Sequence, residues 1–169
     1  KLQQAYKKFE AAQLQQGVTQ NVTGILELAP GFLDALILLK PANWYPDALK
    51  TVEEARNLGE FAGYRPAMVV HYHYLSLLKE NKGDLPGAVA ESQKAVKILE
   101  QLVAQYGGLT PQGLRLKELS PRVYENSTRL LAKSGDVQQA VVTIDRAQQL
   151  LSLGQLEPKS GQNSPIAGN

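Results

Sequence analysis

The sequence has no cysteine, a single methionine and two histidines among its 169 residues. The absence of cysteine excludes disulfides, thiolate catalysis and zinc sites built on thiolates. It does not identify a compartment, but together with the single Met68 it favours an extracytoplasmic location. The chain begins at Lys1 without a signal-peptide pattern, so we expect a processed mature chain or a fragment of a longer one.

The chain also has no strong charge of either sign and no long hydrophobic run. Its 18 basic and 16 acidic residues give a net charge of +2, which argues against a nucleic-acid partner or a membrane-surface role on charge alone. The longest apolar run, "FLDALILL", is interrupted by Asp34. It falls well short of the roughly 18 residues that a membrane-spanning helix needs.

The chain does contain an internal repeat in which two alanines flank a variable residue. Its four copies are Ala5–Phe9–Ala12, Ala48–Val52–Ala55, Ala88–Ser92–Ala95 and Ala140–Ile144–Ala147. A spacing of four and then three residues places all three positions on one face of a helix. Small residues on such a face allow neighbouring helices to approach closely. The pattern therefore predicts four helices that pack through alanine-lined faces.

A turn signal precedes three of these copies. Gly83-Asp84 and Gly135-Asp136 stand at matching positions, and Asn43-Trp44 occupies the corresponding place in the second copy. Glycine commonly ends a helix, and aspartate caps the next one. The spacing predicts a tight turn between two helices at each place.

Another apolar helix is predicted upstream of each turn, over 32–40, 66–82 and 121–133. Ser120 is the expected N-cap of the last of these, with Pro121 in its first turn. The Gly-rich insertion before it is expected to hold a short helix beginning at Pro111. No segment alternates as a strand does, so the sequence predicts an all-α fold.

Residues 13–31 allow two interpretations. In the first, 1–16 is the second helix of an incomplete repeat. In the second, 1–16 and 18–28 form a compressed hairpin that ends at Pro30. The Ala-x3-Phe pattern favours the first interpretation, and the "LELAP" sequence favours the second.

Helix–turn–helix units with Gly-Asp turns and an A-x3-F…A second helix resemble the tetratricopeptide repeat (TPR) family. The resemblance is best over 69–99 and 121–151, although the units are longer than the family period of about 34 residues. It implies an αα-superhelix, a TPR-like solenoid of three to four hairpins over residues 1–154. A short Gly-, Ser-, Pro- and Asn-rich tail follows over 155–169. Long units of this kind are similar to the TPR-like regions beside CHAT-type protease domains in bacteria.

No constellation for catalysis, cofactor binding or metal binding is recognisable in the sequence. On a helix, His71 and His73 point about 200° apart and cannot grip one ion. Ser76 and Lys79 match the S-x-x-K pattern of serine acyl-transfer enzymes, but the companion motifs are absent. No phosphate-binding loop or dinucleotide fingerprint is present in the sequence. We therefore expect a protein that is not an enzyme and that uses no cofactor or metal.

The resemblance implies that the first helix of each hairpin lines a groove for a partner protein. The candidate groove residues are Val70, His73, Leu77, Glu80, Arg122, Glu125, Arg129 and Lys133. Three of them, Arg122, Arg129 and Lys133, form one basic stripe on which an acidic peptide could dock. The other interpretation of the stripe is a solvated charged face.

The ends of the chain suggest self-assembly. Leu2 and Phe9 belong to an apolar stripe with no helix before it, and the tail carries Leu156, Pro165 and Ile166. Uncapped ends favour head-to-tail association into an oligomer or filament, with the tail docking on a neighbour. We therefore expect a non-catalytic interaction scaffold, most simply a homo-oligomer. The alternative is a peptide-binding adaptor region of a larger signalling or CHAT-protease-associated protein.

Two N-x-[ST] sequons, at Asn21 and Asn126, are possible N-glycosylation sites. Two matches are barely more than this composition gives by chance. Asn21, in a predicted loop, is the better candidate. Either site matters only if the protein reaches a glycosylating compartment.

Overall fold

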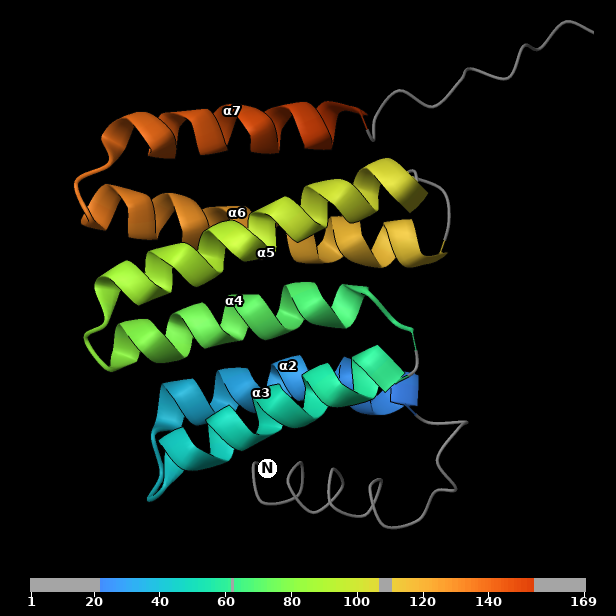
Figure 1. Ribbon diagram of the computed structural model, residues 1–169, viewed down its shortest axis with the longest axis vertical. Helices are drawn as coiled ribbons and strands as arrows, with labels where there is room; N and C mark the ends of the chain where they lie inside the picture. Colours follow the sequence, from blue (N-terminus) through green and yellow to red (C-terminus); the bar gives the residue numbers. More distant parts are fainter. Residues whose placement is uncertain (1–21, 62, 107–110, 154–169) are drawn as a thin grey trace, which may run out of the picture.

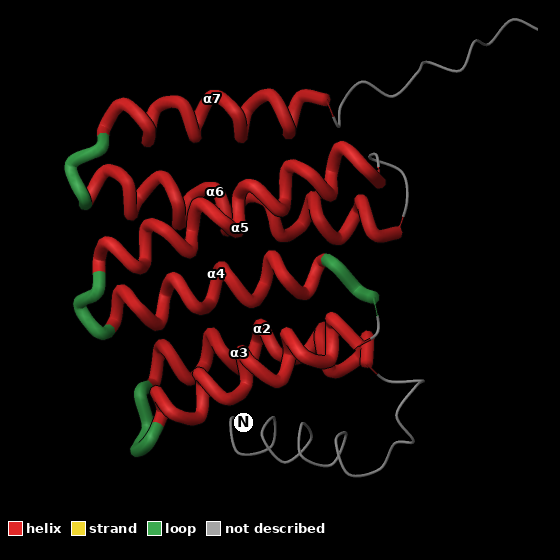
Figure 2. Tube along the Cα trace, viewed as in Figure 1, coloured by secondary structure: helices red, strands yellow, loops and turns green. Residues whose placement is uncertain are grey.

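The computed structural model describes residues 22–61, 63–106 and 111–153 of the chain. Within these ranges it forms six α-helices and no strand (Figures 1 and 2), so the all-α prediction is confirmed for this part. The helices are α2 (Val22–Leu39), α3 (Trp44–Phe61), α4 (Pro66–Asn81), α5 (Leu85–Tyr106), α6 (Pro111–Lys133) and α7 (Val137–Leu153). None of them is both long and apolar enough to cross a membrane.

Consecutive helices run antiparallel, and each packs against the next (Figure 1). In this arrangement α2 and α3 lie at one end of the long axis and α7 at the other. Helix α4 also contacts α2 and α6, so it has neighbours from all three hairpins. The predicted helix over 1–16 and the tail over 155–169 lie outside the described residues.

The predicted turns are present. Gly83 and Gly135 have φ values of +82° and +89°, the left-handed region that ends a helix and that glycine enters without strain. Asn43 replaces glycine in the turn between α2 and α3 and has φ +61°. Asparagine is one of the few other residues that tolerate this conformation. The Gly/Asn turn prediction is thus confirmed at all three places.

The aspartates after the two glycines cap the helices that follow. The Oδ1 of Asp84 accepts a hydrogen bond from the backbone N–H of Gly87 at 2.9 Å. The Oδ1 of Asp136 accepts one from the N–H of Gln139 at 3.1 Å. Each cap satisfies a helix N–H that has no partner inside its own helix.

The alanine-lined faces form the seams between helices. Ala48, Ala88 and Ala95 are fully buried, as the repeat pattern predicts. The last copy is only partly covered, because Ala140 is buried while Ile144 keeps 42% of its surface exposed. The first copy, at residues 5–12, lies outside the described ranges.

The structure corrects the expected start of a helix at Pro121. Helix α6 is continuous from Pro111 to Lys133 with Pro121 inside it, and the Oγ of Ser120 donates to the carbonyl of Leu116 at 2.6 Å instead of capping. An interior proline costs about 3 kcal/mol. Leu116 and Val123 lie on one face across the proline and are both buried, and burying two such side chains contributes roughly 3 to 6 kcal/mol.

Burial on both sides of an interior proline also decides between the two interpretations of residues 13–31. Helix α2 passes through Pro30, with Ala29 and Leu33 fully buried on either side of it. The compressed hairpin that ends at Pro30 is therefore wrong. The helix over 1–16 that the other interpretation expects is not among the described residues.

The close approach of α3 and α4 gives a test of this packing. A Cβ on Gly59 would overlap the Cβ of Ala67 and lie 3.3 Å from the carbonyl oxygen of Tyr64. We expect Gly59→Ala to lower the free energy of unfolding by about 1–3 kcal/mol, as overpacking does. The measurement is urea unfolding followed by circular dichroism.

Gly31 is the matched control, because it also lies inside a helix but a Cβ there meets nothing within 4 Å. Gly31→Ala should raise the free energy of unfolding by roughly 0.5–1 kcal/mol through helix propensity alone. If the two variants change the free energy of unfolding equally and in the same direction, the close α3–α4 contact is contradicted.

Candidate functional site

Both histidines lie on α4, which has buried residues around its circumference. His71 is directed toward α3, where its Nδ1 lies 3.4 Å from the carbonyl oxygen of Val52. His73 lines a pocket together with Asp34 of α2 and Arg122 of α6. The prediction that the two side chains diverge is confirmed, since they meet different neighbouring helices.

Ser76 and Lys79, which match the S-x-x-K pattern, contact different partners. The Oγ of Ser76 donates to the carbonyl of His73 at 2.6 Å and accepts from the Nδ2 of Asn126 at 2.8 Å. The Nζ of Lys79 forms an ion pair with Glu91 at 2.7 Å. The lysine ammonium is thus held by a carboxylate of α5, and the serine belongs to the α4–α6 seam.

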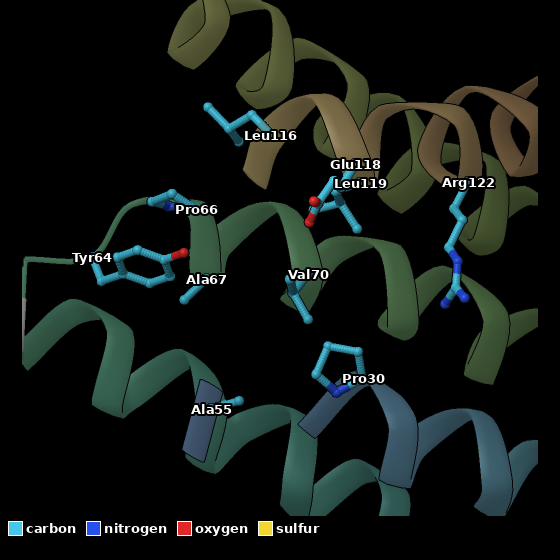
Figure 3. Close-up of a pocket in the computed structure, with 10 residues that line it drawn as sticks. All are labelled: Pro30, Ala55, Tyr64, Pro66, Ala67, Val70, Leu116, Glu118, Leu119 and Arg122. Atoms are coloured by element: carbon cyan, nitrogen blue, oxygen red, sulfur yellow. The ribbon is translucent and has the colours of Figure 1, made fainter. Parts of the chain in front are cut away.

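An apolar pocket of about 350 Å³ opens between α2, α4 and α6 (Figure 3). In the close-up, Val70 of α4 lies between Leu119 of α6 and Pro30 of α2, with Tyr64 at one end and Arg122 at the other. The full lining consists of Pro30, Ala55, Tyr64, Pro66, Ala67, Val70, Leu116, Glu118, Leu119 and Arg122. We call this cavity the apolar pocket.

A second pocket, of about 280 Å³, adjoins the first and is lined mainly by polar and charged residues. Its lining consists of Asp34, His73, Leu77, Arg122, Glu125, Asn126 and Arg129. Arg122 belongs to both linings, so the two cavities are consecutive. We call them together the interhairpin groove, because their walls come from all three hairpins.

The structure places the sequence-predicted groove residues in or beside this groove. Val70 lines the apolar pocket, and five others line the polar pocket: His73, Leu77, Arg122, Glu125 and Arg129. The remaining two, Glu80 and Lys133, join the polar pocket through ion pairs.

Sequence reasoning missed the α2 wall and the first half of α6, which contribute Pro30, Asp34, Leu116, Glu118 and Leu119. A usable signal was present for α6. Leu116, Ser120 and Val123 keep helical spacing across Pro121, which indicates one helix and extends the groove toward its N-terminus.

Two of the three cations in the basic stripe, Arg129 and Lys133, pair with one carboxylate. Glu80 accepts hydrogen bonds of 2.6 and 2.5 Å from the two terminal nitrogens of Arg129, and one of 3.0 Å from the Nζ of Lys133. Its side chain is only 14% exposed. The hydrogen bonds from Arg129 are the main cause that lowers the pKa of Glu80 to about 2. Both cations at this end of the groove, Arg129 and Lys133, are therefore already paired with Glu80.

Arg122 is also paired, across the boundary between the two pockets. It donates to the Oδ2 of Asp34 at 2.9 Å. The other carboxylate oxygen lies 2.8 Å from the hydroxyl of Tyr74, whose oxygen is also 2.9 Å from the carbonyl of Pro30. Burial, and then the bond to Asp34, raise the pKa of Tyr74 above its ordinary value. The phenol thus stays neutral and shares its one proton between two acceptors.

His73 is the buried titratable group of the groove. It is 5% exposed, and its Nδ1 has no hydrogen-bond partner among the described residues. Burial lowers the pKa of His73 from 6.5 to about 4, with Arg122 adding to the effect and Asp34 opposing it. The imidazole is therefore neutral at physiological pH.

The other sequence-predicted residues fall in two groups. Asn126 is 6% exposed and its Nδ2, the atom that a glycan would occupy, donates to Ser76; attachment there would require the α4–α6 seam to open. Six others lie outside the described residues, namely the sequon at Asn21 and the assembly residues Leu2, Phe9, Leu156, Pro165 and Ile166.

Comparison of the chain with models of protein families, with curated proteins and with solved structures finds no match. Within 22–61, 63–106 and 111–153, no group of three or more metal-ligating side chains is placed to hold an ion. The groove presents to a ligand an apolar pocket, a neighbouring polar pocket, and charged side chains that are mostly paired with one another.

His73 predicts a specific acid sensitivity. Between pH 6.5 and about 4 the unfolded chain binds a proton at this imidazole and the folded chain does not. Stability therefore falls as the pH drops through this window, by about 3 kcal/mol in total. We expect His73→Phe to remove most of this loss, measured as the difference in the free energy of urea unfolding between neutral and acidic pH.

His71→Phe is the control. Burial also lowers the pKa of His71, but the contact with the Val52 carbonyl opposes the shift, so its contribution is smaller. The loss of stability from Glu80 falls mainly below this window, between pH 4.5 and about 2, because the pKa of this carboxylate is lowered from 4.5 to about 2 in the folded chain. If His73→Phe keeps the full acid sensitivity of the parent chain, the burial of a neutral His73 is wrong.

Proposed function

We propose that the chain is a TPR-like solenoid that serves as a non-catalytic protein-interaction module and receives a peptide segment of its partner in the interhairpin groove. The observation that carries this proposal is the apolar pocket of about 350 Å³. It opens between three hairpins and continues into a polar pocket along the same groove.

The size and chemistry of the groove fit a peptide. Ligand pockets are typically roughly 300–1,000 Å³ and are lined by apolar groups with a few placed polar ones. Val70, Leu119 and Pro30 give the apolar pocket such walls. The polar pocket beside it offers Asn126 and charged side chains, which can bind the main-chain groups that flank an anchoring side chain.

The resemblance to the TPR family supports the same function. The described helices are consecutive antiparallel pairs, and the groove walls come largely from α2, α4 and α6, the first helix of each pair. In that family these helices face the partner. The proposal includes a role as an adaptor region of a larger signalling or CHAT-protease-associated protein.

The test is a selection of binders from a phage-displayed random dodecapeptide library on the immobilised chain. We expect Val70→Asn to weaken the selected peptides about tenfold, because it removes the burial of one apolar side chain, worth about 1.5 kcal/mol. Affinities are measured by fluorescence anisotropy on protein whose unfolding midpoint has been checked.

Leu38→Asn is the matched control. Leu38 is 80% exposed and lies at the end of α2, away from both pocket linings. Its substitution should leave the affinities unchanged. A selection that yields no specific peptide, or peptides indifferent to Val70→Asn, contradicts the proposed function.

A second candidate function is self-association through the outer face of α7. Val137, Val141 and Ile144 are 62%, 52% and 42% exposed, and their spacing of four and then three residues puts them on one side of the helix. This stripe lies about a quarter of a turn around the helix from the buried Ala140 and Thr143. It supports head-to-tail association into an oligomer or filament, with residues 155–169 as the proposed strap on the neighbour.

The second candidate predicts concentration-dependent oligomers in light scattering. A Val141→Glu/Ile144→Glu double variant should shift the population to monomers, because charges on the contact face oppose association. Removal of residues 155–169 should weaken the oligomer as well. A parent chain that stays monomeric at high concentration excludes this function, while the groove proposal is unaffected.

A further inference from the structure

We infer that the partner segment of the interhairpin groove is basic and amphipathic, with a large apolar side chain flanked by Lys or Arg residues. This inference rests on the proposed function, because it names the partner of the same groove. It reverses the acidic peptide that the basic stripe suggests from sequence alone. The reason is that the cations of the basic stripe are paired with carboxylates in the structure, whereas two other carboxylates of the groove form no ion pair with a described residue.

Every groove cation has an acidic partner. Arg122 pairs with Asp34 at 2.9 Å, and Arg129 and Lys133 both pair with Glu80. An acidic ligand that takes Arg129 has to replace a bidentate contact to a carboxylate that is only 14% exposed. Leaving that carboxylate buried without its partner costs more than an exposed ion pair returns.

Among the described side chains, the groove carboxylates that form no ion pair are Glu118 and Glu125. Glu118 lines the apolar pocket and Glu125 lines the polar pocket. Both are exposed, and no ion pair joins either to another described residue. The hydrogen bond to Glu80 is the main cause that raises the pKa of Arg129, and Glu125 adds to it through space only.

The two carboxylates have a defined spacing. They are seven residues apart on α6, so they lie on the same face and about 10 Å apart along its axis. In an extended segment, side chains two or four positions apart lie on the same face, and four positions span about 13 Å. We therefore expect two basic side chains four positions apart, with the apolar anchor midway between them.

The apolar pocket suits such a segment because, among the described residues, its lining has no charge other than Glu118 and the paired Arg122. The anchor packs on Val70 and Leu119. The aliphatic stem of a neighbouring Lys or Arg can cover the pocket edge while its charged end reaches Glu118. His73 lines the adjoining pocket as a neutral ring, so it adds no positive charge that would repel a basic side chain.

The experiment uses the dodecapeptides selected on the parent chain as probes. We expect an excess of Lys and Arg over Asp and Glu among them, and affinities that fall as salt is raised. Glu118→Gln/Glu125→Gln should weaken binding roughly threefold to tenfold, the range for two solvent-exposed ion pairs. The double variant should also bind with less salt dependence than the parent chain.

Asp145→Asn is the charge control, because Asp145 is exposed on α7 and lies outside both pocket linings. Acidic or neutral peptides, or basic ones that bind the double variant as tightly as the parent chain, overturn the basic partner. If such peptides still respond to Val70→Asn, the proposed groove function stands. Peptides indifferent to Val70→Asn overturn the groove function and this inference with it.

Discussion

The described fold depends on the close packing of α4 against helices on every side. Such packing is possible only where small residues line the seams. Ala67 leaves no room for a side chain at Gly59, and Ser76 is fully buried in the seam with α6. Because α4 is enclosed between the outer hairpins, α2 and α6 are held at a fixed separation across it. The groove is the space that remains between them, so its width is set by seam residues such as Gly59 and Ser76, which lie outside both pocket linings.

The same enclosure governs the electrostatics of the groove. On α4, burial keeps His73 neutral and Tyr74 protonated, whereas Glu80 stays ionised because Arg129 and Lys133 pair with it. Polar groups on the neighbouring helices instead carry charge and pair at the edge, as Asp34 does with Arg122. Neutral groups therefore lie deep in the groove and charged ones near its rim, an order that follows from the cost of burying an ion.

Sequence reasoning could predict the elements whose signals are local. A stripe such as Ala88–Ser92–Ala95 and a turn such as Gly83-Asp84 depend on helix period and backbone conformation alone, and both are confirmed. Helix α6 was not predicted in full, because the break expected at Pro121 is a local rule that burial on both sides of the proline overrides. Local signals thus identify the helices but not where tertiary packing extends them.

In the groove, too, the sequence indicates local features but not contacts between distant helices. The TPR resemblance predicts a groove position for Val70, His73 and Arg129, and each of them lines one of the two pockets. It cannot show that Glu80 pairs with Arg129, since that contact joins residues on different hairpins. The sign of the available charge depends on such pairs, and the sequence alone therefore suggested a partner of the opposite charge.

The two ion pairs of the groove differ in how strongly they resist a ligand. The Asp34–Arg122 pair is 46% and 61% exposed at its two side chains, and an exposed pair of this kind contributes only about 0–1 kcal/mol. Glu80, at 14% exposed, is held by Arg129 and Lys133 together and is more costly to separate. A ligand can therefore rearrange the boundary between the two pockets without disturbing the charged end of the groove. The adaptable part of the groove therefore lies beside the apolar pocket, where an anchoring side chain has to enter. The rigid part lies at Glu80, whose ion pairs with Arg129 and Lys133 fix the register of α4 against α6.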